Sequence, residues 1–247
     1  MSSAAGAAPP GGGAAARPTA LVTGASRGIG RAIALRLAAT HDLIAVARSG
    51  AELQRVADDV ARAGGRCEAV ACDVADPAAV AGALDGRAAD VLVNNAGVGV
   101  LKPMLELTPA EWHRMVDVNV NALYHVTRAV LPGMLARGRG HVVVVGSIAG
   151  RSAFVGGACY AATKHFVMGF AESLMLEVRD AGVKVSVVSP GSVATAFGGG
   201  DGAPDPTKGQ LRASDVAEAV ALTVATPPEV LLHRVEVRIL SPRRPRG

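Results

Sequence analysis

Three side chains in the stretch Gly146–Phe166 could carry out proton transfer. Ser147 directly follows an apolar run, and Tyr160 and Lys164 stand four residues apart in a helix-type segment. Residues at that spacing share one helix face, so the Lys164 ammonium can lie near the Tyr160 phenol. A free tyrosine titrates near ~10, and a neighbouring cation lowers that value. The spacing predicts that Tyr160 exchanges a proton near neutral pH, although this pattern alone also fits a buried tyrosine beside an exposed lysine.

A glycine-rich turn, Thr23–Gly30, follows the first apolar run and leads into a helix-type segment. Glycine permits positive φ and close backbone approach, and a helix N-terminus offers free N–H groups and a positive dipole end. These features predict a pyrophosphate site, although a purely structural turn also fits them. The spacing of Gly24, Gly28 and Gly30 differs from the G-x-G-x-x-G pattern. No Lys-Ser/Thr pair follows the last glycine, which argues against a nucleoside triphosphatase.

Two arginines are expected beside this turn. Arg27 lies inside it, and Arg48 follows the second strand-type run, where no carboxylate is close. An acidic residue at that place would bind a ribose 2′-hydroxyl, whereas an arginine accepts a 2′-phosphate. Two guanidinium groups suit planar, bidentate binding of one phosphate. The pattern favours NADP over NAD, and the alternative is that both are ordinary surface arginines.

Short apolar runs alternate with helix-type segments from Arg17 onward. This pattern is typical of α/β proteins in which helices cover both faces of a parallel sheet. The runs predict strands over Ala20–Thr23, Leu43–Ala47, Glu68–Cys72, Val91–Asn94, His141–Gly146, Lys184–Ser189 and Val235–Leu240. Helices are expected on the stripe Ile29, Ile33 and Leu37, and over Glu52–Ala63, Pro77–Leu84, Pro109–Arg137, Tyr160–Asp180 and Ser214–Ala225. The Gly- and Pro-rich stretch Phe197–Gly209 predicts a mobile loop or lid.

Length and composition favour one large domain. The 247 residues are half apolar, which is enough to bury a sizeable core. We expect a disordered segment over 1–16, one domain over 17–242 and a basic tail over 243–247. We do not expect a secretory signal in residues 1–16, and no apolar run of the sequence approaches the roughly 18 residues that a membrane span needs.

The cysteines, the histidines and the net charge argue against several classes of site. Three cysteines without a C-x-x-C pair favour a reducing cytoplasm over a disulfide framework or a zinc site. The six histidines show no metal-binding spacing. The net charge of +4 is modest, and the arginine tail lacks the aromatic platforms of nucleic-acid-binding modules. We therefore expect no metal, no nucleic acid and no membrane partner.

Taken together and in order, the motifs of the chain give it a family likeness. From about Arg17 to about Pro242 it resembles the short-chain dehydrogenase/reductase family, and is similar to its NADP-dependent ketoreductases of the 3-oxoacyl-[acyl-carrier-protein] reductase type. The matching pieces are TGASRGIG, CDV at Cys72–Val74, NNAG at Asn94–Gly97, VNV around Asn119, Ser147, YAATK at Tyr160–Lys164 and PGSVAT at Pro190–Thr195. The resemblance implies a single doubly wound Rossmann-type domain with about seven strands, and hydride transfer between a nicotinamide and a carbonyl or secondary alcohol.

The resemblance also implies roles for individual residues. Tyr160 would be the general acid/base, Ser147 would hydrogen-bond the substrate oxygen, Lys164 would hold the nicotinamide ribose and lower the phenol pKa, and Asn119 would support a water that relays protons to Lys164. Asp73 and Val74 would meet the adenine, Asn95 the adenine ribose region, and Val193 with Thr195 the nicotinamide end. The other residues that would bind the cofactor are Gly24, Ser26, Arg27, Gly28, Ile29, Gly30, Arg48, Ala96, Gly97, Tyr160, Lys164, Pro190 and Gly191.

The substrate is less well defined. The loop after Thr195 is short and Gly-rich, and the end VEVRILSPRRPRG departs from the Gly-rich closing segment of the family's acyl reductases. An apolar small-molecule substrate would suit a pocket lined by Val98, Val100, Leu101, Met104, Phe154, Val155 and Phe197, with Lys102, Arg151 or Arg212 near an anionic handle. The same residues also fit ordinary loop packing.

The resemblance also implies an assembly, and one different functional class stays open. Homo-oligomers, dimeric or tetrameric, would use the helices Pro109–Arg137 and Tyr160–Asp180 as interfaces. A different functional class, a non-catalytic NADP-binding sensor that acts through partners, remains the alternative, and the complete set of Ser147, Tyr160, Lys164 and Asn119 argues against it.

Overall fold

The structure is a computed structural model of the chain, and it describes residues 16–199 and 209–240. The expected N-terminal segment over 1–16 therefore lies outside the described residues except for its last position, and the expected basic tail lies outside them completely. Of the expected loop Phe197–Gly209, the structure describes only the first three residues and the last.

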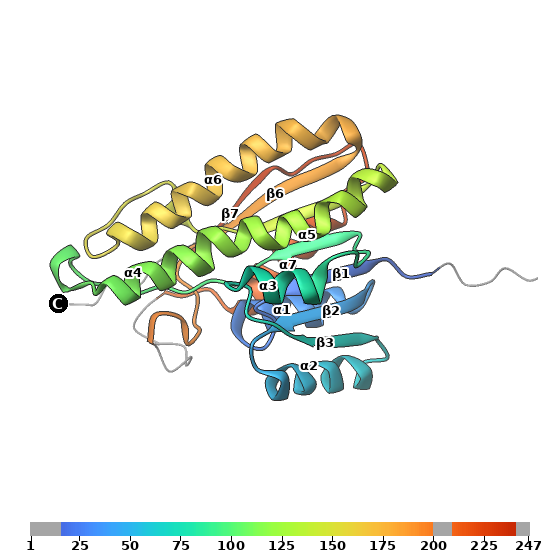
Figure 1. The fold of residues 1–247 in the computed structure, drawn as a ribbon, viewed down its shortest axis with the longest axis horizontal. Helices are drawn as coiled ribbons and strands as arrows, with labels where there is room; N and C mark the ends of the chain where they lie inside the picture. The colour runs from blue at the N-terminus through green and yellow to red at the C-terminus, as the bar shows by residue number, and fades with distance from the viewer. Residues whose placement is uncertain (1–15, 200–208, 241–247) are drawn as a thin grey trace, which may run out of the picture.

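One parallel sheet of seven strands forms the centre of the described chain, in the order β3-β2-β1-β4-β5-β6-β7 (Figure 1). Its strands are β1 (Thr19–Thr23), β2 (Asp42–Ala47), β3 (Cys67–Ala71), β4 (Val91–Asn94), β5 (Gly140–Val145), β6 (Val183–Pro190) and β7 (Arg234–Val237). The chain builds outward from β1 in one direction and then from β4 in the other. Parallel α/β sheets open a crevice at such a reversal, outside the carboxyl ends of the strands.

The described ranges contain seven α-helices. They are α1 (Gly28–Leu37), α2 (Gly50–Arg62), α3 (Pro77–Leu84), α4 (Pro109–Val116), α5 (Ala122–Arg137), α6 (Ala158–Val178) and α7 (Ala213–Val224). All of them except α4 pack on one of the two faces of the sheet. Side chains of α3, α5 and α6 belong to one core, and side chains of α1, α2 and α7 belong to the other. The predicted doubly wound Rossmann-type α/β fold is confirmed.

The strands are apolar on both sides because successive residues enter opposite cores. In β1, Leu21 lies in the core of α3, α5 and α6, whereas Ala20 and Val22 lie in the core of α1, α2 and α7. A strand buried on both faces needs apolar residues at every position. This explains why nearly continuous apolar runs predicted the central strands.

Most predicted boundaries agree with the structure to within two residues, and two predictions are wrong. The last strand ends at Val237 rather than at Leu240, because its final partner on β6 is Pro190, the last residue of that strand. The single helix expected over Pro109–Arg137 is interrupted by a π-helical turn, Asp117–Asn121, between α4 and α5. Such a turn adds one residue to the helical repeat and is frequent at functional sites.

Among the helices in the described ranges, none combines the length and the apolar character that crossing a membrane requires.

Candidate active site

The glycine turn between β1 and α1 is built for close backbone approach. Gly24 and Gly28 have φ values of 64° and 55°, which L side chains rarely adopt. At Gly30 the constraint is space, because a Cβ atom would lie 2.1 Å from the Gly24 carbonyl oxygen. The turn therefore exposes backbone N–H groups at the start of α1 with no side chains in the way.

The end of β4 holds this turn in place. The side-chain amide of Asn95 donates to the carbonyl oxygens of Thr23 at 2.9 Å and Gly24 at 3.3 Å. The Thr23 hydroxyl in turn accepts from the backbone N–H groups of Asn95 at 3.0 Å and Ala96 at 3.1 Å. The Asn95 amide is thus used to support the glycine turn, and its expected contact with the adenine ribose region stays a prediction.

Arg27 and Arg48 are both exposed beside the turn. Within the described part of the chain, neither makes an ion pair, whereas Arg31 is bound to Asp59 of α2. Arg27 lines a hollow of about 430 Å³ between the start of α1 and α2, together with Ser26, Arg31, Glu52, Arg55, Asp58, Asp59 and Arg62. Guanidinium groups without a partner are available for an anionic group at this edge.

Asn119 lies at the centre of the π-helical turn and is buried. Its side-chain oxygen accepts from the Val98 N–H at 2.9 Å, and its side-chain nitrogen donates to the Val98 carbonyl at 2.8 Å and to the Thr163 hydroxyl at 3.1 Å. The amide thereby links the strand end after β4 to α6. The VNV motif indicated Asn119, but no local pattern indicated Val98 and Thr163 as its partners.

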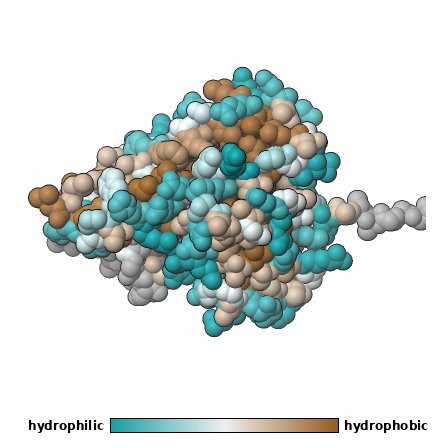
Figure 2. All heavy atoms as spheres, in the orientation of Figure 1, coloured by the Kyte–Doolittle hydropathy of each residue, from teal (hydrophilic) through white to brown (hydrophobic). Residues whose placement is uncertain are grey.

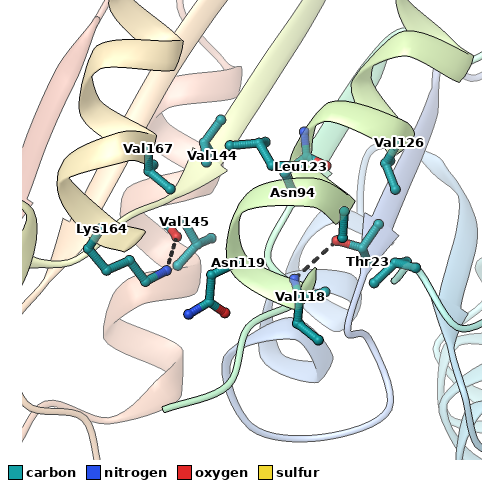
Figure 3. A pocket seen from close by; sticks show the side chains of 13 residues that line it. Thr23, Asn94, Val118, Asn119, Leu123, Val126, Val144, Val145, Lys164 and Val167 are labelled. Carbon is teal, nitrogen blue, oxygen red and sulfur yellow. Dashed lines mark hydrogen bonds between the residues drawn. The ribbon is translucent and has the colours of Figure 1, made fainter. Parts of the chain in front are cut away.

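Lys164 reaches from α6 into the interior beside β5. Its Nζ donates to the Val145 carbonyl at 3.1 Å and lies 6.0 Å from the centre of the Tyr160 ring. Burial lowers the pKa of Lys164 to about 8. Lys164 and Asn119 line one small cavity of about 20 Å³ (Figure 3), which is room for about one water molecule.

Tyr160 and Ser147 meet at the carboxyl end of β5. Burial raises the pKa of Tyr160, and a hydrogen bond with Ser147 acts in the opposite direction. The net lowering expected for the Tyr160 pKa is wrong for this structure, because burial is the largest effect and raises that pKa. The Lys164 ammonium donates to the Val145 carbonyl. Tyr160 and Lys164 are neighbours, as their four-residue spacing predicted.

The other expected cofactor residues lie at or after the carboxyl ends of β1, β3, β4 and β6. Val74 and Ala96 line the small cavity, and Ile29 lies in the first turn of α1. Pro190 is the last residue of β6, and the N–H of Gly191 donates to the Val237 carbonyl. Val193 forms a β-bridge with Leu211. A Cβ atom at Gly97 would lie 3.9 Å from the Lys164 Nζ, and one at Gly28 would lie 3.5 Å from Thr195. Asp73 forms an ion pair with Arg114 of α4 at 3.6 Å, a partner that no local pattern indicated.

Among the described residues, no group of three or more His, Cys, Asp or Glu side chains is placed so that it could hold a metal ion.

Comparison with known proteins gives one family. The sequence model described as short chain dehydrogenase matches residues 18–203. Sulfoacetaldehyde reductase 2 of Chromohalobacter salexigens is 36% identical over 233 residues, which cover 88% of this chain and 92% of that protein. The NADP-dependent 3-hydroxy acid dehydrogenase of Escherichia coli K12 is 34% identical over 233 residues, with 88% and 93% covered.

Solved structures agree with the sequence comparison. A metagenomic short-chain oxidoreductase in complex with NADP superposes with a TM-score of 0.77 at 34% identity, covering 90% of this chain and 97% of that one. An alcohol dehydrogenase from the archaeon Thermococcus sibiricus, complexed with 5-hydroxy-NADP, has a TM-score of 0.85 at 30% identity, with 93% and 99% covered. A 3-ketoacyl-ACP reductase from Sinorhizobium meliloti has a TM-score of 0.81 at 31% identity, with 90% and 97% covered. These relatives differ in the substrates that their names give.

Proposed function

The chain belongs to the short-chain dehydrogenase family, and from this premise we propose that it is an NADP-dependent oxidoreductase that interconverts a carbonyl group and a secondary alcohol, with Tyr160 as general acid and base. The observation that carries the proposal is the meeting of Tyr160, Ser147 and Lys164 at the carboxyl end of β5. The segment after β4 connects this site to the glycine turn, because Asn95 binds the Thr23 and Gly24 carbonyls and Gly97 lies beside Lys164 and Asn119.

The residues around the turn fit a dinucleotide. Gly24, Gly28 and Gly30 leave the N-terminus of α1 open to a pyrophosphate. Arg27 and Arg48 are exposed near it without a carboxylate partner in the described ranges, and arginine pairs suit a 2′-phosphate. The relatives named as NADP-dependent, and the NADP complexes among the similar structures, support NADP rather than NAD. Bound NADPH would supply the hydride.

The protein's own groups manage the proton and the charge. As hydride reaches the carbonyl carbon, the oxygen takes the Tyr160 proton, and the Ser147 hydroxyl donates a hydrogen bond to the same oxygen. Tyr160 is left as a tyrosinate. The Lys164 ammonium, whose pKa of about 8 keeps it largely protonated at neutral pH, stabilises that negative charge. Asn119 acts indirectly, by holding the strand end at Val98.

A panel of ketones and secondary alcohols, assayed with the full chain by NADPH absorbance, tests the proposal. We expect turnover with NADPH and carbonyl substrates, and a loss on the order of 10² to 10⁴-fold in Tyr160→Phe, because general acid catalysis is removed. NADPH binding by the variant, followed by fluorescence, should stay near that of the parent protein.

The outcomes separate the two functional classes. Turnover that survives in Tyr160→Phe would remove Tyr160 from its role. Tight NADPH binding without turnover of any compound would favour the non-catalytic sensor. The enzyme is the better-supported class because Tyr160 and Ser147 meet beside Lys164, and a proton donor paired with a second hydroxyl is not needed for cofactor binding alone.

We also propose a homo-oligomer. Large apolar side chains are exposed on the helices expected at the interfaces: Trp112 on α4, Tyr124 on α5 and Leu176 on α6. Such side chains on neighbouring helices suit burial by a second copy.

The free cysteines Cys67, Cys72 and Cys159 fit a reducing, cytoplasmic location.

A further inference from the structure

Phe197 packs directly on the proposed acid/base. Its ring centre lies 5.6 Å from that of Tyr160, with an angle of 59° between the planes. This tilted arrangement is one that aromatic pairs favour. Phe197 therefore covers one side of the Tyr160 ring.

Gly99 makes this contact possible. A Cβ atom at Gly99 would lie 2.5 and 2.6 Å from two carbons of the Phe197 ring and 3.4 Å from Tyr160 Cδ2. The first two distances are far shorter than van der Waals contact, and they involve a ring with no flexible end. Only a residue without a side chain at position 99 leaves room for Phe197 in this position.

The segment that carries Phe197 is seated against the glycine turn. The Phe197 N–H donates to the Thr195 hydroxyl at 3.4 Å, and the Thr195 methyl lies 3.5 Å from the place of a Gly28 Cβ. One side of Phe197 is therefore packed, while 44% of the residue remains exposed. The exposed part faces solvent at the edge of the site.

Further apolar side chains are exposed on the loop that continues from Gly99 and on the loop joined to it. The loop after β4 and the loop after β5 are joined by a hydrogen bond from the Lys102 N–H to the Gly156 carbonyl at 2.9 Å. These two loops expose Leu101, Met104, Leu105, Phe154 and Val155. Figure 2 shows hydrophobic atoms at the end of the molecule where the segment before α4 lies.

Within the described residues, the three cations expected near an anionic substrate group are already paired. An anionic substrate group could use Lys102, Arg151 or Arg212, but each of them contacts a carboxylate: Lys102 contacts Glu111 at 2.5 Å, Arg151 contacts Glu236 at 3.0 Å and Arg212 contacts Asp215 at 2.8 Å. The Lys102 contact lowers the pKa of Glu111 to about 2, which keeps that carboxylate charged. A second carboxylate would have to displace the first.

We propose that Phe197, seated on Tyr160 and Gly99, is a specificity-determining wall of the substrate site, and that the site selects neutral apolar carbonyl compounds over those with an anionic group. Sulfoacetaldehyde and 3-hydroxy acids, named for two relatives, both carry an anionic group. This chain would thus differ from those relatives in substrate class. The inference rests on the proposed function.

A matched pair of ketones tests the substrate class. Ethyl acetoacetate and acetoacetate present the same carbonyl, but only the second is an anion. With NADPH and the full chain, we expect kcat/KM to favour the ester by at least about tenfold, because Lys102, Arg151 and Arg212 are already paired with carboxylates and the substrate carboxylate loses water against apolar side chains. Equal values, or a preference for acetoacetate, would overturn the substrate class.

Two variants test the wall itself. Phe197→Ala should lower kcat/KM for the ester by roughly tenfold, mainly through KM, and change the value for acetoacetate little. Gly99→Ala should act in the same direction by displacing Phe197, and the double variant should be no worse than Phe197→Ala alone. Leu135→Ala removes an exposed apolar side chain near the end of α5 and should leave both values unchanged. Additive losses, or equal losses for both ketones, would contradict the role of Phe197.

A binding measurement keeps this proposal separate from the proposed function. With NADP⁺ present, ethyl 3-hydroxybutyrate should raise Tm, and 3-hydroxybutyrate should not. If the ester and the acid shift Tm equally while NADP⁺ is bound, the neutral substrate class is overturned, even where other carbonyl compounds are reduced. Failure of the whole carbonyl panel is the result that overturns the function.

Discussion

The Lys164 ammonium contacts a backbone carbonyl and stands beside the Tyr160 ring. Its Nζ lies 3.1 Å from the Val145 oxygen and 6.0 Å from the centre of that ring. Burial lowers the pKa of Lys164 to about 8 and raises the pKa of Tyr160. The protein thus keeps a poorly solvated cation next to the phenol whose anion it would stabilise.

Replacing this lysine should stabilise the fold while it destroys activity. In the unfolded chain Lys164 titrates near 10.5, so folding is opposed by desolvation of the ammonium, fully below pH 8 and progressively less up to pH 10.5. Lys164→Met should raise the free energy of unfolding at pH 7 by roughly 2 kcal/mol. Urea denaturation measures this.

Lys184 provides the matched control. Its Nζ has four oxygen partners: the Thr226 carbonyl and hydroxyl, and the carbonyls of Pro227 and Val230. Lys184→Met should therefore give no stabilisation. A Lys164→Met protein less stable than its parent would show that the ammonium is better solvated than its burial indicates.

Asn119 should be a positioning residue whose loss weakens the fold. Removal of its amide leaves the Val98 N–H and carbonyl without their side-chain partner, together with the Thr163 hydroxyl. Unpaired buried groups are costly, and Asn119→Ala should lower the free energy of unfolding by roughly 2 to 3 kcal/mol. Asn121→Ala, two residues away and exposed with a bond to Asp117, should cost less than about 0.5 kcal/mol. Similar losses in both variants would argue against the clamp on Val98.

Cofactor preference should depend on Arg48. Arg48→Asp places a like charge beside the expected 2′-phosphate and should weaken NADPH binding by roughly tenfold to a hundredfold, with NADH binding little affected. Fluorescence titration with both cofactors measures this. Arg179→Asp makes the same change in net charge at the end of α6 and should leave both affinities unchanged. An undiminished preference of Arg48→Asp for NADPH would defeat the assignment.

His141 should make the protein acid-sensitive. It lies buried between β5 and β6, where its Nε2 contacts the Ser186 hydroxyl at 2.8 Å, and burial followed by the Lys184 charge lowers its pKa to about 3. Between about pH 6.5 and 3 the unfolded chain binds a proton that the folded chain does not, so stability falls as pH falls in this window. From pH 8 to pH 5.5 this group should remove about 1.4 kcal/mol.

The His141→Gln protein should lack this loss when urea denaturation is compared at the two pH values. The exposed His113→Gln variant should retain the loss of the parent. The same acid sensitivity in all three proteins would assign it to other groups.

The sequence by itself determined the layered fold and most of the groups at the site. Apolar runs such as Val91–Asn94 predicted buried strands because a strand covered on both faces needs apolar residues throughout. The conformational limits of Gly24 and Gly28, and the four-residue spacing of Tyr160 and Lys164, are likewise local properties.

Only the tertiary structure decided what these groups contact. The π-helical turn at Asn119 depends on Val98, which is 21 residues earlier in the chain. The partner of Lys164 is a backbone carbonyl, which no residue type can indicate. Phe197 meets Gly99, and Arg151 meets Glu236, across long stretches of sequence. The physical reason is that hydrogen bonds, desolvation and ion pairing depend on which distant segments the fold brings together, whereas helix and strand patterns depend on near neighbours.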